Sequence, residues 1–204
     1  MSQAEAVVQA VFGAEVQSIS RYVDILASRG IEWGLLGPRE VGRLWDRHVA
    51  NSVSCSPLIP PSARVVDVGS GAGLPGIPLA ILRPDLDVTL LEPLLRRVNF
   101  LELAVAELGL GERVRVIRGR AEDHALTYDV VTCRALAPLP RLLGWCDPLR
   151  GEGGRIVALK GSSAAEEVAA VAGELRRRRL QAVVEELSLP GLDDPTWAVV
   201  VRGR

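Results

Sequence analysis

Cysteine is scarce in this chain, and the few cysteines follow no recognisable spacing. Only three occur among the 204 residues, at Cys55, Cys133 and Cys146, and no two of them form a C-x-x-C pair. An odd set without that spacing excludes a disulfide framework and provides no zinc-ligand pattern. We therefore expect reduced, mostly buried thiols and no metal site.

Long apolar runs are also absent. No stretch approaches the roughly 18 apolar residues that cross a bilayer, and the segment from Met1 to Glu5 lacks the basic and apolar regions of a secretory signal. We therefore expect a cytoplasmic protein without membrane contact. A chain of this length predicts one globular domain with a substantial core.

Net charge is nearly zero, and lysine is almost missing. The 24 Lys and Arg residues balance 25 Asp and Glu residues, and Lys160 is the only lysine. This balance excludes bulk attraction to nucleic acid, so any nucleic-acid site must be a local patch. The one dense cationic run, four arginines at 176–179, ends a predicted helix. These arginines either form a solvated face that complements the C-terminal end of the helix dipole or contact RNA, and the sequence favours neither role over the other.

A glycine-rich loop is the most informative feature of the sequence. Gly69, Gly71 and Gly73 follow a short apolar strand and precede a helix. Glycine permits positive φ and close approach of a ligand, and the helix start offers free N–H groups. Residues 71–76 satisfy the dinucleotide pattern G-x-G-x-x-G, but Asp67 before the first glycine gives D-x-G-x-G-x-G, which is typical of S-adenosylmethionine-dependent methyltransferases. We favour that cofactor and keep an NAD-dependent oxidoreductase as the alternative.

The chain changes character at a proline cluster near residue 60. Residues 3 to about 55 carry apolar stripes at helical spacing, and prolines at 57, 60 and 61 end that pattern. We therefore expect an N-terminal helical extension over residues 1–60 and an S-adenosylmethionine-binding domain over residues 61–204. In the second part, predicted strands cover 64–69, 87–92, 113–118, 128–133, 154–160, 181–189 and 196–202, and predicted helices cover 76–82, 94–108, 137–149 and 164–179.

The last two predicted strands have only a turn signal, at 190–195, between them, so they should pair as a hairpin. The pattern predicts an α/β, Rossmann-like fold with a mostly parallel seven-stranded sheet and a terminal antiparallel hairpin. This is the fold class of the class I S-adenosylmethionine-dependent methyltransferases, and a dinucleotide-binding domain does not predict such a hairpin.

Other candidate ligand residues follow the next two strands. Glu92 ends the second strand about twenty residues after the glycine loop, where a carboxylate can accept hydrogen bonds from ribose hydroxyls of either cofactor. Ala121 and Glu122 follow the third strand. Since ligands bind outside the carboxyl ends of parallel strands, we expect a backbone amide and a carboxylate there to meet the adenine edge.

The end of the fourth strand bears on the reaction. Methylation of an exocyclic base amine usually uses an Asn/Asp-Pro-Pro-aromatic motif at this point, and the sequence has none. Methylation of a pyrimidine carbon requires a cysteine nucleophile, for which Cys133 is the candidate. No neighbouring His, Lys or acidic residue in the sequence would lower the pKa of that thiol, so we disfavour a covalent mechanism.

Several longer motifs run along nearly the whole chain. They are LWDRHV at 44–49 with NS at 51–52, DVGSGAGLPGIP at 67–78, RVNFL at 97–101, RAE at 120–122, RALA at 134–137 and LKG at 159–161. Together they resemble the RsmG (GidB) family of bacterial 16S ribosomal RNA (guanine-N7)-methyltransferases. The resemblance implies cofactor contacts from Gly69, Leu74, Ala121, Glu122 and Arg134, with Glu92 replacing an aspartate.

Three positions depart from the family pattern. Residues 31–38 lack the W-N-x-x-x-N-L-T segment, Asn51 replaces an acidic residue, and Cys133 replaces a serine. A position that accepts serine does not depend on a thiolate, which further disfavours Cys133 as a nucleophile.

The resemblance implies that S-adenosylmethionine donates a methyl group to N7 of a guanine in 16S ribosomal RNA, as naked RNA or in the small subunit. N7 carries a lone pair and no proton, so no general base is required. An arginine fork on O6 and N7 would block the reacting atom. We therefore expect Arg134 and Lys160, the predicted catalytic residues, to contact the cofactor carboxylate, phosphates or O6 alone.

Further residues are expected to contact the RNA, and the enzyme is expected to be a monomer. The predicted RNA contacts are Arg47, His48, Arg97 and Lys160, with helix packing and capping as the alternative for Arg47 and His48. A methyltransferase for another substrate and a noncatalytic RNA-binding module remain as alternatives.

Overall fold

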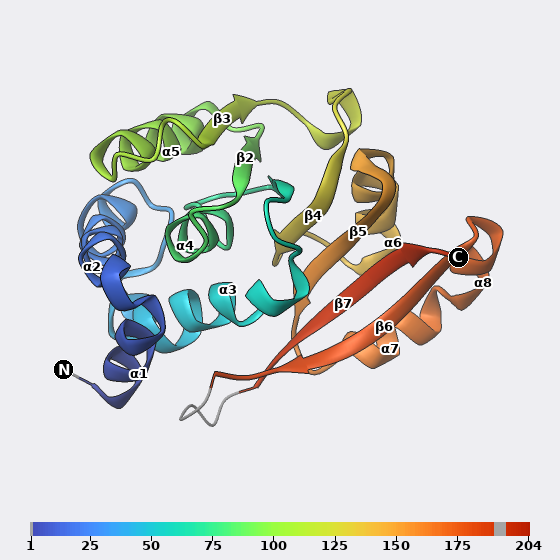
Figure 1. Ribbon diagram of the computed structural model, residues 1–204, viewed down its shortest axis with the longest axis horizontal. Helices are drawn as coiled ribbons and strands as arrows, with labels where there is room; N and C mark the ends of the chain where they lie inside the picture. Colours follow the sequence, from blue (N-terminus) through green and yellow to red (C-terminus); the bar gives the residue numbers. More distant parts are fainter. Residues whose placement is uncertain (1, 190–194) are drawn as a thin grey trace.

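The computed structural model describes residues 2–189 and 195–204. Within them, seven strands form one sheet in the order β3-β2-β1-β4-β5-β7-β6 (Figure 1). The strands are β1 Arg64–Val68, β2 Asp87–Glu92, β3 Val114–Arg118, β4 Tyr128–Arg134, β5 Arg150–Lys160, β6 Leu180–Leu187 and β7 Thr196–Gly203. Strand β7 runs antiparallel to both of its neighbours, and the other adjacent pairs are parallel. The predicted fold class is confirmed, while most of the predicted turn, at 190–194, lies outside the described residues.

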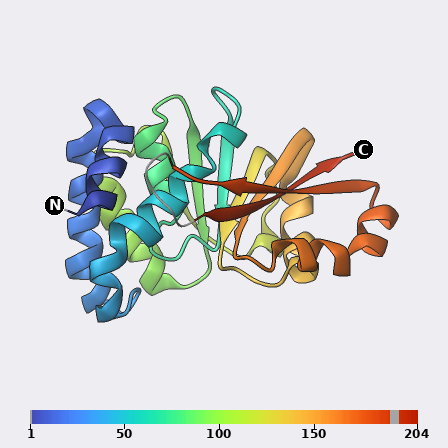
Figure 2. The ribbon, with the colours of Figure 1, turned by 90° about the horizontal axis from the view of Figure 1, so that it is seen from below.

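Helices cover both faces of the sheet, as the alternating strand side chains require (Figures 1 and 2). On one face, Val65 and Leu90 pack in a single apolar cluster with α4 Gly76–Leu82, α5 Leu95–Glu107 and the N-terminal helices. On the other face, Val66 and Leu91 pack with α6 Leu139–Cys146, α7 Ala164–Ala170 and α8 Ala172–Arg177. Three short 3-10 turns, η5 Ser56–Leu58, η6 Ala121–Asp123 and η7 Asp147–Leu149, lie in connections between these elements.

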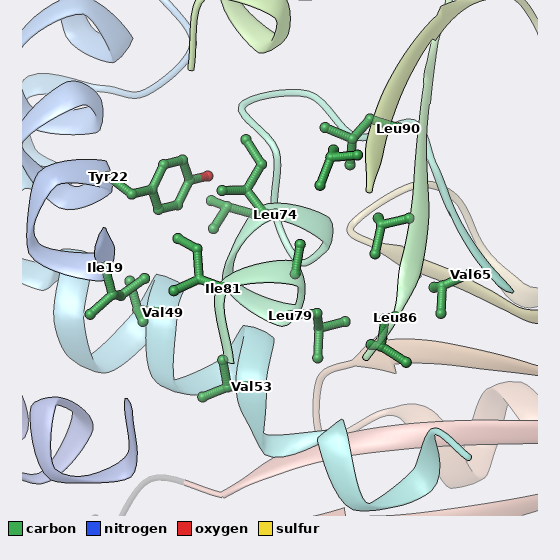
Figure 3. Packing of buried hydrophobic residues seen from close by; sticks show 14 of the residues in the cluster. Ile19, Tyr22, Val49, Val53, Val65, Leu74, Leu79, Ile81, Leu86 and Leu90 are labelled. Carbon is green, nitrogen blue, oxygen red and sulfur yellow. The ribbon is translucent and has the colours of Figure 1, made fainter. Parts of the chain in front are cut away.

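The N-terminal residues form a helical layer against α4. It contains α1 Gln3–Phe12, η1 Gly13–Glu15, α2 Val16–Ile25, η2 Leu26–Gly30, η3 Pro38–Arg43, η4 Leu44–Ala50 and α3 Asn51–Ser54. Ile19 and Val49 from this layer lie near Ile81 of α4, whereas Leu79 points toward Leu86 on the other side of that helix, as Figure 3 shows. The extension therefore shares its apolar core with one face of the sheet, and the domain boundary at residue 60 stays a prediction.

The structure departs from the expected elements at three places. The chain leaves helical geometry over residues 33–37, where Gly34 has φ +64° and Gly37 precedes Pro38. The single helix predicted over 164–179 is two helices, since the buried Val171 has φ −102° and ψ 10°. Strand β5 begins at Arg150 rather than 154, because Arg150 pairs with Tyr128 beyond a register shift. No helix in the described part of the chain is both long and apolar enough to cross a membrane.

Candidate functional site

The predicted ligand residues gather at the edge of the sheet where the parallel strands end. Gly69 follows β1, Glu92 is the last residue of β2, and Ala121 and Glu122 follow β3. These four residues line a cavity of about 400 Å³ together with Arg97. We call it the small cavity. Its volume lies within the range typical of cofactor sites.

A larger cavity of about 870 Å³, which we call the large cavity, lies beside it. Its walls come from the N-terminal layer, the end of β4 and the end of β5, and they include Arg47, His48, Arg134 and Lys160. Ala135 and Leu136, directly after β4, line both cavities and so lie at their junction. The structure thus divides these nine predicted site residues between two adjoining cavities.

The glycine loop adopts backbone conformations that favour glycine. Gly69, Gly71 and Gly73 have φ values of +70°, +60° and +94°. A Cβ at Gly69 would collide with the side chain of Leu136, and one at Gly73 would collide with Ile77. Gly69 is therefore needed at the wall of the small cavity, whereas Gly73 is needed for packing of the loop against α4.

Glu92 braces the glycine loop from the neighbouring strand. Its carboxylate is 1% exposed, with Oε2 accepting a hydrogen bond from the backbone N of Gly71 at 3.0 Å and Oε1 from that of Leu94 at 3.0 Å. Nη1 of Arg97 lies 3.7 Å from Oε2. Each carboxylate oxygen has a second lone pair, so Glu92 can accept ribose hydroxyls while it holds the loop.

Asp67 lies behind the loop and lines neither of these cavities. Its Oδ2 accepts a hydrogen bond from the backbone N of Gly76 at 3.0 Å, while the buried Oδ1 has no partner among the described residues. Burial raises the pKa of Asp67 to about 7. The predicted residues Gly71, Gly73 and Leu74 likewise line neither cavity, so their cofactor contacts, like that of Asp67, stay predictions.

Arg134 is held by acceptors from the N-terminal layer. Its Nη1 donates to the carbonyl oxygens of Arg47 at 3.2 Å and His48 at 3.4 Å, and its Nη2 donates to Nδ1 of His48 at 2.6 Å. Nε2 of His48 lies 2.8 Å from Oε2 of Glu40. Burial and the neighbouring Arg134 lower the pKa of His48, so the imidazole is neutral at neutral pH.

Lys160, at the end of β5, connects the segment after β4 with α7 at the large cavity. Its Nζ donates to the carbonyl oxygen of Ala137 at 2.8 Å and to Oε2 of Glu167 at 2.7 Å. Glu167 also accepts a hydrogen bond from the backbone N of Leu139 at 2.8 Å. Glu40 and Glu167 lie outside the sequence motifs, and their contacts with His48 and Lys160, eight and seven positions away in the chain, depend on how the intervening residues fold.

Cys133 does not meet the requirements of a nucleophile. Its thiol is 1% exposed and lines neither cavity. A contact with Cys146, together with burial, raises the pKa of Cys133 well above its ordinary value. The thiol therefore stays protonated, which agrees with a mechanism without a covalent intermediate.

Sequence comparison identifies the family. The family model for rRNA small subunit methyltransferase G (GidB) matches residues 15–190. The chain belongs to the rRNA small subunit methyltransferase G family. It is 51% identical to the ribosomal RNA small subunit methyltransferase G of Kineococcus radiotolerans over 194 residues, covering 94% of this chain and 76% of that relative. It is 55% identical to the Thermobifida fusca protein of the same name, covering 83% of this chain and 72% of that relative.

Solved structures show the same fold at low sequence identity. A ribosomal protein L11 methylase from Lactobacillus delbrueckii aligns with a TM-score of 0.57 and 16% identity, over 76% of this chain and 77% of that one. A methyltransferase from Geobacter sulfurreducens, solved with S-adenosylhomocysteine, aligns with a TM-score of 0.54 and 15% identity, over 75% of this chain and 89% of that one. Membership of the GidB family confirms the predicted methyltransferase activity and S-adenosylmethionine as its cofactor.

The small cavity fits this cofactor. It has the volume for an adenosine, a buried carboxylate at Glu92 for ribose hydroxyls, and a glycine at position 69 where a Cβ would intrude. Among residues 2–189 and 195–204, no group of three or more His, Cys, Asp or Glu is placed to hold a metal ion.

Proposed function

We propose that this GidB-family protein transfers a methyl group from S-adenosylmethionine to N7 of a guanine in 16S ribosomal RNA. The observation that carries the proposal is the junction of the two cavities at Ala135 and Leu136. A donor in the small cavity and a base in the large cavity would meet there. The family's name supports ribosomal RNA of the small subunit as the substrate.

The small cavity would hold the cofactor by residues from three strand ends. Glu92 would accept the ribose hydroxyls, Ala121 and Glu122 would meet the adenine, and Gly69 would let the backbone approach the ligand. When bound, S-adenosylmethionine supplies an electrophilic methyl group on a sulfonium. These protein groups bind and orient it, and none of them has to move a proton.

The large cavity would receive the guanine and its flanking phosphates. Its polar wall carries Arg134 and Lys160, and the exposed Arg47 lies at the same cavity. Guanine N7 needs no general base, which agrees with a site whose histidine is already engaged by protein groups. The chain would therefore accelerate transfer mainly by holding donor and acceptor in the correct orientation.

Nucleoside mass spectrometry tests this proposal directly. The purified chain would be incubated with S-adenosylmethionine and either naked 16S ribosomal RNA or small subunits from a strain that lacks the homologous enzyme. We expect the nucleoside digest to contain 7-methylguanosine, and the methyl group to be at a single guanine of the RNA. A methyl group on another atom or another RNA, or no transfer to either substrate, would overturn the proposed specificity.

A further inference from the structure

Three side chains from three separate elements form a continuous line to the wall of the large cavity. Glu40 belongs to η3, His48 to η4 and Arg134 to the end of β4. From this geometry we infer that Glu40 and His48 are positioning residues that fix the guanidinium of Arg134 for the proposed reaction. Neither residue is assigned this role by the family motifs, and the catalytic part of the inference rests on the proposed function.

The hydrogen bonds determine which tautomer His48 adopts. A guanidinium has only donors, so Nδ1 of His48, 2.6 Å from Nη2 of Arg134, must act as an acceptor and carry no proton. The proton of the neutral ring is then on Nε2, which donates to the Glu40 carboxylate at 2.8 Å. Glu40 and Arg134 therefore select the same tautomer from opposite sides of the ring.

This arrangement restricts Arg134 without using all of its donors. Nη1 donates to the two carbonyl oxygens of residues 47 and 48, and one N–H of Nη2 donates to His48. An arginine has five N–H donors, so Nε–H and the second N–H of Nη2 remain. These two donors can bind an oxygen of the cofactor or the RNA in the large cavity, which Arg134 lines.

His48 is poorly placed to contact RNA itself. Its side chain is 7% exposed, and both ring nitrogens are engaged by protein groups. The structure thus favours an indirect role over the RNA contact predicted from the sequence. Arg47 remains available as an RNA contact, since its side chain is 50% exposed and pairs with Glu40 through Nη1 at 3.2 Å.

Protonation of His48 would break its hydrogen bond with Arg134. An imidazolium carries a proton on Nδ1, which removes the acceptor and places two positive charges together. Glu40 and Arg47 flank His48, while Tyr22 and Asp67 act on Arg134 from α2 and β1. We therefore expect methyl transfer to fall as the pH drops below the lowered pKa of His48. The pKa of Asp67 is about 7, which is close to this pH range, so mutation must separate the effect of Asp67 on the pH profile from that of His48.

Histidine NMR tests the geometry without any assay of activity. The chain has two histidines, so His124→Gln assigns the ring signals of His48 in long-range ¹H–¹⁵N spectra. We expect a neutral ring at pH 7.5 with the proton on Nε2. In Arg134→Ala we expect the pKa of His48 to rise, because a neighbouring positive charge is lost. A proton on Nδ1 in the wild-type chain would overturn the inference.

Two isosteric substitutions then separate the two ends of the ring. In His48→Asn, the amide oxygen replaces Nδ1 and can still accept from Arg134. In His48→Gln, the amide replaces Nε2 and keeps only the contact with Glu40. We expect kcat to fall on the order of tenfold or more in His48→Gln, and clearly less in His48→Asn, because misplacement of a reacting group is costly.

The pH profile supplies the readout that a purely structural role would not change. We expect His48→Asn to lose the decline of kcat at acid pH, and Glu40→Gln to move that decline to lower pH, since the carboxylate favours the imidazolium. An unchanged decline in His48→Asn would assign it to Asp67 and overturn the inference, as would equal kcat losses in the two His48 variants. Thermal unfolding of each variant shows whether the fold is retained.

The NMR result also separates this inference from the proposed function. If the wild-type chain methylates no guanine N7 but His48 shows the Nε2–H tautomer, the proposed function fails and the positioning geometry stands. If the chain methylates N7 but His48 carries its proton on Nδ1, the positioning role fails and the proposed function stands.

Discussion

Tyr22 of α2 donates a hydrogen bond of 2.7 Å to the carbonyl oxygen of Ala72 in the glycine loop. The side chain of Tyr22 is fully buried, and burial raises the pKa of its hydroxyl well above the ordinary value, so it remains a donor. The N-terminal helices therefore support the glycine loop through a specific contact as well as through apolar packing.

The first prediction concerns this contact. In Tyr22→Phe we expect a loss of about 1 kcal/mol in the free energy of unfolding and weaker binding of S-adenosylhomocysteine, because the carbonyl of Ala72 loses its donor. Urea denaturation and calorimetry measure the two effects. Tyr128→Phe is the matched control: it removes a hydroxyl 2.8 Å from His124 and should leave cofactor affinity unchanged. Equal affinities in both variants would contradict the supporting role.

A second prediction concerns the wall of the small cavity. In Gly69→Ala the new Cβ would collide with Leu136, and the φ of +70° is unfavourable for alanine. We expect S-adenosylhomocysteine to bind at least about tenfold more weakly, since alanine is strained at this φ and the backbone shifts where the ligand approaches. Gly111→Ala is the control, because a Cβ there meets nothing within 4 Å. Similar affinity in Gly69→Ala and the wild type would contradict the placement of the cofactor beside Gly69.

Much of the fold was predictable because its signals are local. Apolar runs such as 64–68 and 87–92 are short, are bounded by turns and lie buried between two helical layers. The glycine loop needs positive φ at three positions, and only glycine adopts that region routinely. The position of Glu92 beside the loop was predictable because its distance in sequence from the loop follows from the length of one helix and one strand.

The rest depended on contacts that no local pattern encodes. Glu40 reaches His48 from the helical segment that precedes it, η3, and the pair meets Arg134, which is 86 residues further along the chain than His48. Tyr22 resembles any other buried residue of an amphipathic helix until the tertiary structure brings it to Ala72. The sequence predicted which strand ends face the ligand, but not which side chains hold them in place.

The third prediction uses the buried carboxyl of Asp67, whose pKa is raised to about 7 in the folded chain and is about 3.9 in an unfolded chain. Between these values the folded state binds the proton more tightly, so stability falls as the pH rises. We expect Asp67→Asn to remove this fall, on the order of 2 kcal/mol between pH 5 and pH 8. Urea denaturation at both pH values measures it.

The control for Asp67→Asn is Asp85→Asn. A hydrogen bond from Arg83 lowers the pKa of Asp85, so this carboxylate stays ionised from pH 5 to pH 8. Asp85 therefore does not contribute to the change in the free energy of unfolding over this pH range. The Asp85 variant should therefore show the same pH dependence as the wild type. If the free energy of unfolding changed equally between pH 5 and pH 8 in Asp67→Asn and in the wild type, a raised pKa for Asp67 would be contradicted.

The fourth prediction addresses Cys133. We expect Cys133→Ser to keep methyl transfer within about threefold of the wild type, since a protonated, buried thiol does not attack a base. Cys146→Ser tests a second buried thiol in contact with the first, and should behave alike in the same assay. A Cys133→Ser chain that folds and binds S-adenosylhomocysteine but transfers no methyl group would restore the covalent mechanism.

The last prediction concerns Arg134, which lines the large cavity and is held by acceptors from the N-terminal layer. We expect Arg134→Ala to lower kcat on the order of 100-fold, because a positioned charge at the proposed reaction site is lost. The fold should persist, since Arg134 is only half-buried and contributes no apolar core. Steady-state kinetics with 16S ribosomal RNA, together with circular dichroism, measures both effects.

Arg134→Lys distinguishes charge from geometry. Lysine keeps the positive charge but cannot donate to two carbonyl oxygens and to Nδ1 of His48 in the planar arrangement that Arg134 uses. If orientation matters more than charge, Arg134→Lys should resemble Arg134→Ala in kcat. Recovery of most activity by lysine would show that the charge alone suffices, and normal activity with normal cofactor affinity in Arg134→Ala would remove Arg134 from the site altogether.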